Sequence, residues 1–144
     1  MLDILLGGIG MAIKWTPNLS VGVDFIDEQH KGLFEKASQL FEAGQKGEGK
    51  EFMLQMLDFL SEYTKTHFRD EEKYMESIKY PELEAQKKAH AYFEQELAQL
   101  RKDYTESGGS LVLLVKANKM IVDWLTKHIS SMDKKIGEYA AALK

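Results

Sequence analysis

Apolar residues recur at spacings of three and four along four segments of this 144-residue chain, and short turns rich in glycine or proline separate the segments. This spacing predicts amphipathic helices with one buried stripe each. The four segments run from Asp24 to about Ala43, from Gly49 to Ile78, from Pro81 to the "ESGGS" turn at 106–110, and from Ser110 to Ile129. Four such helices bury their stripes most simply as an up-down-up-down four-helix bundle. We therefore predict an all-α fold of this kind, with an extended N-terminal arm and a short C-terminal helix.

Turn residues mark the expected helix ends. Gly44 is a typical C-terminal stop, Pro81 suits the first turn of a helix, and Ser110 suits an N-cap. Trp15 and Pro17 lie in a segment of small apolar residues, which predicts an arm packed along the bundle.

Composition restricts the class of protein. The chain has no cysteine, which excludes disulfides, thiolate zinc sites and cysteine nucleophiles. Its net charge of -4 comes from interspersed acids and bases, so we expect no nucleic-acid partner. No apolar run approaches the roughly 20 residues of a membrane span. We expect the protein to lie in the cytoplasm and to be a monomer. We interpret residues 1–10 as an N-terminal extension and 11–144 as one domain. The extension is either translated ahead of a true start at Met11 or a short packing or self-association segment.

Each predicted helix carries one histidine on its apolar stripe: His30, His67, His90 and His128. Counted from the turns at ~1.5 Å per residue, the depths of His67 and His90 agree to within about 5 Å and those of His90 and His128 to within about 3 Å. His30 matches less well, but the glycine-rich loop of the first hairpin can absorb the difference. A single inward histidine is more often a hydrogen-bonded core residue than a ligand. Four at one depth predict a shared layer of imidazoles.

Glu71 joins this layer because it follows His67 by one helical turn, which brings both side chains to the same face. Taken alone, it could be an ion pair at the end of the bundle. Its neighbours Asp70 and Glu72 are expected to point elsewhere, into solvent.

Asp133 requires a further assumption. It follows His128 by five residues, a spacing that would turn it about 140° away on a regular helix. We expect Ser130 and Ser131 to break or cap the helix, so that the chain folds Asp133 back over the layer. Taken alone, Asp133 is more often a helix cap.

Burying four imidazoles and two carboxylates together without a counter-charge would cost many kcal/mol, and a metal removes that cost. Six donor residues are more than the four ligands of a structural zinc site, and carboxylates can bridge two ions. Mixed imidazole and carboxylate ligands suit iron, or manganese beside iron. The paired Glu-x-x-His motifs of ferritin-like di-iron bundles are absent, and Asp27 with His30 is the nearest match.

Several segments resemble the hemerythrins, and specifically the bacteriohemerythrins, over about residues 11–139. These are Trp15, "SVGVDFIDEQHKGLF" around His30, "HFRDEEKYM" from His67, "H-x-x-F" from His90 and "WLTKHISSMD" from Trp124. The resemblance implies a non-haem di-iron centre, bridged by carboxylates and an oxo or hydroxo group, that binds dioxygen at one iron.

Matching motif positions imply a role for each site residue. One iron, the oxygen-binding one, would have His30 and His67 as ligands, and the other would have His90 and His128. Glu71 and Asp133 would bridge the two. The family's apolar oxygen pocket would correspond to Phe68, Trp124, Leu125 and Ile129.

Position 86 departs from the family pattern, which has histidines four apart on the third helix. Gln86 either ligates weakly through its carboxamide oxygen or hydrogen-bonds to a ligand, and either role leaves the second iron with a weaker or open position. We expect an oxygen-binding protein for storage, transport, delivery or sensing. The alternatives are a di-iron enzyme acting on dioxygen, peroxide or nitric oxide, and a mono-iron or mixed-metal variant.

Overall fold

The computed structural model of the chain describes residues 14–144. The predicted extension at 1–10 and the domain start at Met11 lie outside the described residues.

Helices make up nearly all of the described chain, and residues 14–144 contain no strand. Their order confirms the predicted all-α bundle with a short C-terminal helix. The elements are the 3-10 helix η1 (Pro17–Leu19), the helices α2 (Asp24–Gln45), α3 (Lys50–Ser77), α4 (Leu83–Glu106) and α5 (Leu111–His128), the π-helical turn η2 (Ile129–Asp133) and the helix α6 (Lys134–Ala142).

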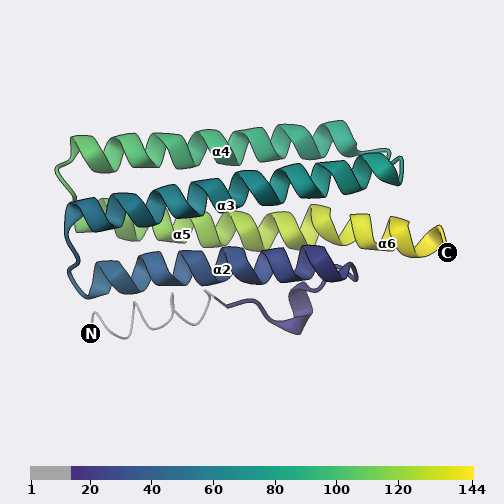
Figure 1. Ribbon diagram of the computed structural model, residues 1–144, viewed down its shortest axis with the longest axis horizontal. Helices are drawn as coiled ribbons and strands as arrows, with labels where there is room; N and C mark the ends of the chain where they lie inside the picture. The colour runs from purple at the N-terminus through teal and green to yellow at the C-terminus, as the bar shows by residue number, and fades with distance from the viewer. Residues whose placement is uncertain (1–13) are drawn as a thin grey trace.

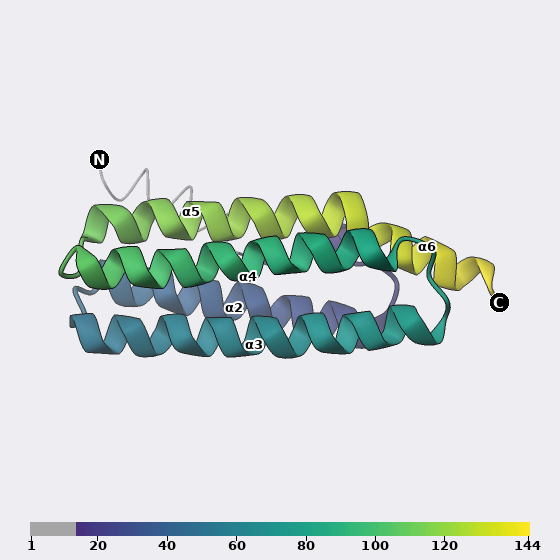
Figure 2. The same ribbon diagram turned by 90° about the horizontal axis from the view of Figure 1, so that it is seen from above.

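The four long helices lie antiparallel, each beside the next in sequence, and α5 closes the bundle against α2 (Figures 1 and 2). Because η2 continues α5 directly into α6, the last helix projects past the end of the bundle (Figure 1). This up-down-up-down order brings one inward face of every helix to a common axis.

The core consists of the predicted stripes. Ile26, Leu40, Leu60 and Ile121 are completely buried, and they come from three of the long helices. Met56, Tyr63 and Leu83, which continue the apolar spacing of their helices, are partly exposed but still pack against the core. The apolar periodicity therefore predicted the packing faces correctly.

Two predicted helix ends were wrong. Helix α2 continues through Gly44 and ends at Gln45, because Gly44 is a packing position. A Cβ atom at Gly44 would lie 2.7 Å from the Leu114 side chain, so glycine lets α5 approach closely. Helix α4 begins at Leu83, two residues after Pro81. The predicted N-cap is confirmed, since Ser110 Oγ accepts a hydrogen bond from the Leu113 amide across 3.3 Å.

The N-terminal arm is tied to the bundle by Asp27. The carboxylate of Asp27 accepts hydrogen bonds from the Ser20 hydroxyl (2.6 Å) and the Val21 amide (2.8 Å). Asp27 therefore fastens the arm, and its spacing from His30 has no part in a ligand motif. The carbonyl of Val21 packs directly on Gly137 of α6, where no side chain intervenes.

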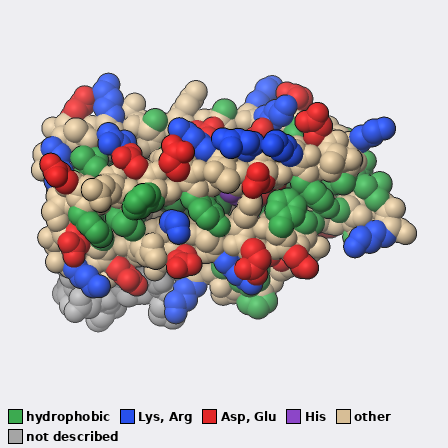
Figure 3. All heavy atoms as spheres, viewed as in Figure 1, with side chains coloured by type: hydrophobic (Ala, Val, Ile, Leu, Met, Phe, Trp, Pro, Cys, Tyr) green, Lys and Arg blue, Asp and Glu red, His purple; other side chains and the backbone are tan. Residues whose placement is uncertain are grey.

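The surface mixes charges. On the face shown in Figure 3, acidic and basic side chains are interspersed with small apolar areas. None of the helices within residues 14–144 has a stretch long and apolar enough to cross a membrane.

Candidate metal centre

Six buried side chains from five elements meet inside the bundle. Each long helix contributes one histidine, α3 adds a glutamate, and η2 adds an aspartate. All six are at least nine-tenths buried, and Glu71 is completely buried. They are His30, His67, Glu71, His90, His128 and Asp133. The structure thus brings together every residue predicted as a metal ligand.

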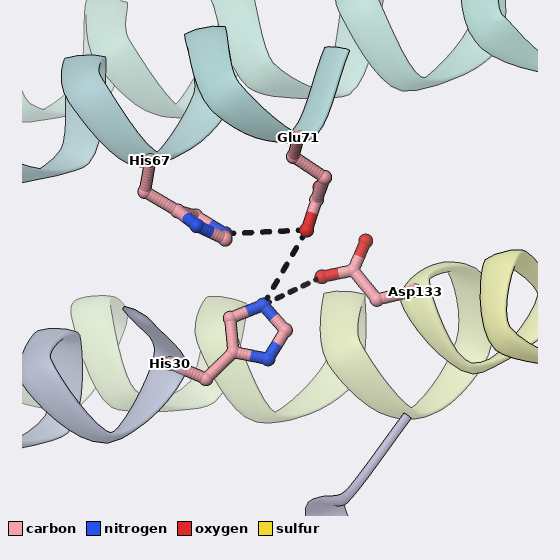
Figure 4. A group of neighbouring side chains, drawn as sticks. All are labelled: His30, His67, Glu71 and Asp133. Atoms are coloured by element: carbon pink, nitrogen blue, oxygen red, sulfur yellow. Dashed lines mark ion pairs between the residues drawn. The ribbon is translucent and has the colours of Figure 1, made fainter. Parts of the chain in front are cut away.

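The first half of the centre lies between α2 and α3. Oε2 of Glu71 is 3.2 Å from Nε2 of His67 and 3.6 Å from Nε2 of His30. Nε2 of His30 also lies 3.1 Å from Oδ2 of Asp133. Figure 4 shows these side chains directed at a common space from different sides.

The second half lies between α4 and α5 and uses the other oxygen of each carboxylate. Oε1 of Glu71 is 3.1 Å from Nε2 of His90. Oδ1 of Asp133 is 3.2 Å from Nε2 of His128. Each half therefore has two imidazoles, and each carboxylate offers one oxygen to each half.

These distances fit two metal ions. Imidazole nitrogens and carboxylate oxygens bind divalent transition-metal ions at about 2.0–2.2 Å. Two donors at right angles on one such ion therefore lie about 3 Å apart. The donor atoms of each half lie within 4.8 Å of one another. Two imidazoles and two shared carboxylates per half make a donor set suited to iron.

Buried polar atoms without hydrogen bonds gather at the same point. Nε2 of His30, His90 and His128 and both carboxylate oxygens of Glu71 are buried and have no hydrogen-bond partner. A buried polar atom left in this state costs about 1–3 kcal/mol. The arrangement is therefore expensive unless ions or protons lie between the donors.

Protons supply part of this compensation when no ion is bound. Burial alone would raise the pKa of Glu71, but the imidazoles of His67, His30 and His90 outweigh it and hold that pKa well below its ordinary value. Burial alone would lower the pKa of His30, but Asp133 and Glu71 raise it to about 9. Since metal ligands must be deprotonated, ions would displace these protons.

Asp133 reaches the centre by a different route from the predicted one. No break or cap occurs at Ser130 and Ser131; the helix widens into the π turn η2 over Ile129–Asp133. A π turn takes about one residue more than an α turn, so a residue five positions on returns to the same face. Asp133 therefore lies on the face of His128, and the Ser131 hydroxyl bonds back to the Lys127 carbonyl across 2.6 Å.

The imidazoles of His67 and His90 are each hydrogen-bonded by a polar partner on the side of the ring away from the centre. Nδ1 of His67 lies 2.7 Å from Oε1 of Gln29, whose Nε2 donates to Asp70 Oδ2 across 2.8 Å. Nδ1 of His90 lies 2.7 Å from Oε2 of Glu72. Asp70 and Glu72 point away from the centre and are partly exposed, as expected, but they are not simply solvated, because each accepts a hydrogen bond that supports a buried ring. Donation from Nδ1 leaves the Nε2 lone pair of each ring free for a metal.

Comparison with known proteins gives the family of the chain. Residues 21–140 match the family model of the hemerythrin HHE cation-binding domain. The chain belongs to the hemerythrin family. It is 29% identical to a bacteriohemerythrin of Stenotrophomonas maltophilia over 90% of this chain and 82% of that protein. It is 30% identical to a bacteriohemerythrin of Methylococcus capsulatus over 90% and 98%. A myohemerythrin of Theromyzon tessulatum is 29% identical over 85% and 88%.

Gln86 lies beside the second half of this hemerythrin centre. It is 1% exposed, and its Nε2 donates a hydrogen bond to Asp133 Oδ1 across 3.1 Å. Its Oε1 is buried without a partner. In this arrangement the carboxamide acts on a shared carboxylate, while its oxygen has no bond of its own.

Aromatic rings of the hemerythrin bundle cover the second half. Phe68 stacks on His90 with centroids 3.8 Å apart, and Trp124 stacks on His128 at 4.4 Å. Phe68 also lies 5.7 Å from the His67 ring, so it contacts both halves. Leu125 and Ile129 are buried on the same helical stretch. Of the four residues predicted as an oxygen pocket, Phe68 and Trp124 thus stack on rings of the centre, while Leu125 and Ile129 are buried on either side of His128 in sequence.

Proposed function

We propose that this chain is a non-haem di-iron protein that binds dioxygen reversibly. The observation that carries the proposal is that the two oxygens of each carboxylate face different halves of the centre. Glu71 and Asp133 both direct one oxygen to His30 and the other oxygen to the second pair of imidazoles. This is the arrangement expected of carboxylates that bridge two ions. The names of the relatives, bacteriohemerythrin and myohemerythrin, support the same assignment.

The ligand roles follow from the motif positions. We assign His30 and His67 to the iron that takes dioxygen, His90 and His128 to the other, and Glu71 and Asp133 to both. When bound, two ferrous ions together supply the two electrons that reversible dioxygen binding requires. Manganese beside iron is the alternative metal content.

The side chains around the ligands have separate tasks. Gln29 and Glu72 fix the rings of His67 and His90 with Nε2 facing the centre. Phe68 and Trp124 keep water from the imidazoles that they cover, with Leu125 and Ile129 beside them. Exclusion of water strengthens every charge interaction inside the site and suppresses loss of electrons to solvent. Storage, delivery or sensing of dioxygen in the cytoplasm is the role that we infer.

Rapid mixing of the diferrous protein with oxygen tests this function. We expect a visible absorption band that forms on mixing, persists, and disappears when oxygen is removed. A band that decays at once while a supplied reductant is consumed would instead identify a di-iron enzyme. Iron-reconstituted protein that develops no band and consumes no oxygen would overturn both assignments.

A further inference from the structure

His67 and His90 are held in the same way by partners of different charge. Nδ1 of each ring lies 2.7 Å from a side-chain oxygen on the preceding long helix. For His67 this oxygen belongs to the neutral carboxamide of Gln29, and for His90 it belongs to the carboxylate of Glu72. The geometry is matched, so charge is the main difference between the two contacts.

A carboxylate partner makes an imidazole a stronger donor. A hydrogen bond to an ionised acceptor is roughly twice as strong as a neutral one. It draws the Nδ1 proton away from the ring and increases the electron density at Nε2, the atom that faces Glu71 across 3.1 Å. The Glu72 side chain is 27% exposed, so water screens part of its charge, while the short contact with His90 remains.

The half of the centre that Glu72 supports is also the half with Gln86. Gln86 donates to Oδ1 of Asp133, the same oxygen that faces His128. That oxygen therefore divides its lone pairs between an amide hydrogen and the position of an ion. The other oxygen, Oδ2, faces His30. In the half containing His90 and His128, Gln86 thus competes with the ion for a carboxylate oxygen of Asp133. In the same half, Glu72 makes the His90 imidazole a stronger donor.

We propose that Glu72 is a positioning residue that allows the half of the centre formed by His90 and His128 to retain its metal ion, by strengthening His90 where Gln86 weakens the hold of Asp133. The inference rests on the proposed di-iron function. In this proposal the two metal positions have the same kind and number of direct ligands, but they differ in metal affinity because the residues that hydrogen-bond to those ligands differ.

Anaerobic titration with ferrous iron, followed by calorimetry, tests the inference. The wild-type protein should bind two ions in two steps. Glu72→Gln keeps the size of the side chain and removes its charge, and it should weaken one step by about 10- to 100-fold while leaving the other unchanged. Glu76→Gln is the matched control, since Glu76 is exposed on the same helix, and it should change neither step.

Two further variants separate this role from general damage to the fold. Gln86→His in the Glu72→Gln background adds an imidazole donor and should restore the weakened binding step. If Glu72→Gln had only damaged the fold, this second substitution would not restore the step. Gln29→Glu gives His67 a charged partner, and it is combined with Asp70→Asn because Asp70 Oδ2 now accepts from Gln29 across 2.8 Å and would repel a second carboxylate. The Gln29→Glu/Asp70→Asn variant should tighten the step that Glu72→Gln leaves unchanged.

The results that contradict the inference are distinct from those that contradict the function. If Glu72→Gln leaves both steps as in the wild type, or weakens both equally, Glu72 does not support one position. If the double variant fails to regain the lost step, the compensation between Glu72 and Gln86 is wrong. If the wild-type protein binds no iron at all, the proposed function itself is wrong.

Discussion

Gln86 donates a hydrogen bond from its Nε2 atom to the Oδ1 atom of Asp133 across 3.1 Å. Gln86 also precedes His90 by one helical turn, so both side chains face the centre from α4. Gln86→His should therefore add a fifth protein donor to the half formed by His90 and His128. We expect this variant to lose the ion held by His90 and His128 to a chelator at least about 10-fold more slowly than the wild type.

Gln86→Leu is the control for this substitution, because leucine fills a similar volume without a donor. Because it frees Oδ1 of Asp133 but adds no imidazole, it should lose the ion held by His90 and His128 at a rate between those of the wild type and the histidine variant. Equal rates of iron release from the histidine variant and the wild type would show that position 86 does not determine retention.

Substitution of Glu71 should affect both ions, since its two oxygens face different pairs of imidazoles. Glu71→Gln removes the shared negative charge and leaves a neutral side chain of the same size. We expect the purified variant to retain less than about a tenth of the wild-type iron after dialysis against a chelator. Metal analysis by mass spectrometry gives the result, and retention of one full equivalent would contradict a bridging role.

The stability of the metal-free protein should fall at alkaline pH because of His30. Contacts with Asp133 and Glu71 outweigh burial and raise the pKa of His30 from 6.5 to about 9. The folded protein thus holds this proton more tightly than the unfolded chain. The resulting stabilisation is fully present below pH 6.5 and is lost as the pH rises through about 9.

The carboxylates act in the opposite direction. Despite burial, neighbouring imidazoles lower the pKa of Glu71 below 4.5 and that of Asp133 below 3.8. Their contribution is present above these ordinary values and is lost as the pH falls. Thermal unfolding of chelator-treated protein should therefore give its highest midpoint on the acidic side of neutrality. A midpoint that stays constant from pH 6.5 to 9 would contradict the charge pairing at His30.

Contact between the N-terminal arm and α6 can be tested at Gly137. A Cβ atom there would overlap the carbonyl oxygen of Val21, and backbone cannot move aside cheaply. We expect Gly137→Ala to lower the free energy of unfolding by about 1–3 kcal/mol in a denaturant titration. Gly49→Ala is the control, since a Cβ atom at Gly49 meets nothing within 4 Å. Equal stabilities of the two variants would show that the arm does not pack there.

The sequence predicted those features that depend on one helix at a time. The inward direction of the four histidines and of Glu71 follows from the apolar stripes on their own helices, and the structure brings them together. Asp133 was predicted to join them, but through a helix break. The π turn over Ile129–Asp133 that carries it could not be predicted from the spacing of apolar residues, because it differs from an α turn by only about one residue.

Features that depend on two helices could not be predicted in this way. Glu72 lies beside Glu71 in sequence, a position that predicts a solvated side chain, yet its carboxylate contacts His90 on α4. Gln29 reaches His67 on α3 in the same manner. Both contacts are set by the rotation and spacing of adjacent helices, which periodicity within a single helix does not determine. A polar residue directly beside an inward ligand was the signal that could have indicated them.

Diffraction data collected at the iron absorption edge from crystals of the iron-reconstituted protein test the central claim most directly. We predict two anomalous peaks inside the bundle, one beside His30 and His67 and one beside His90 and His128, with Glu71 and Asp133 between them. A single peak, or none in protein that remains folded, would contradict the di-iron assignment.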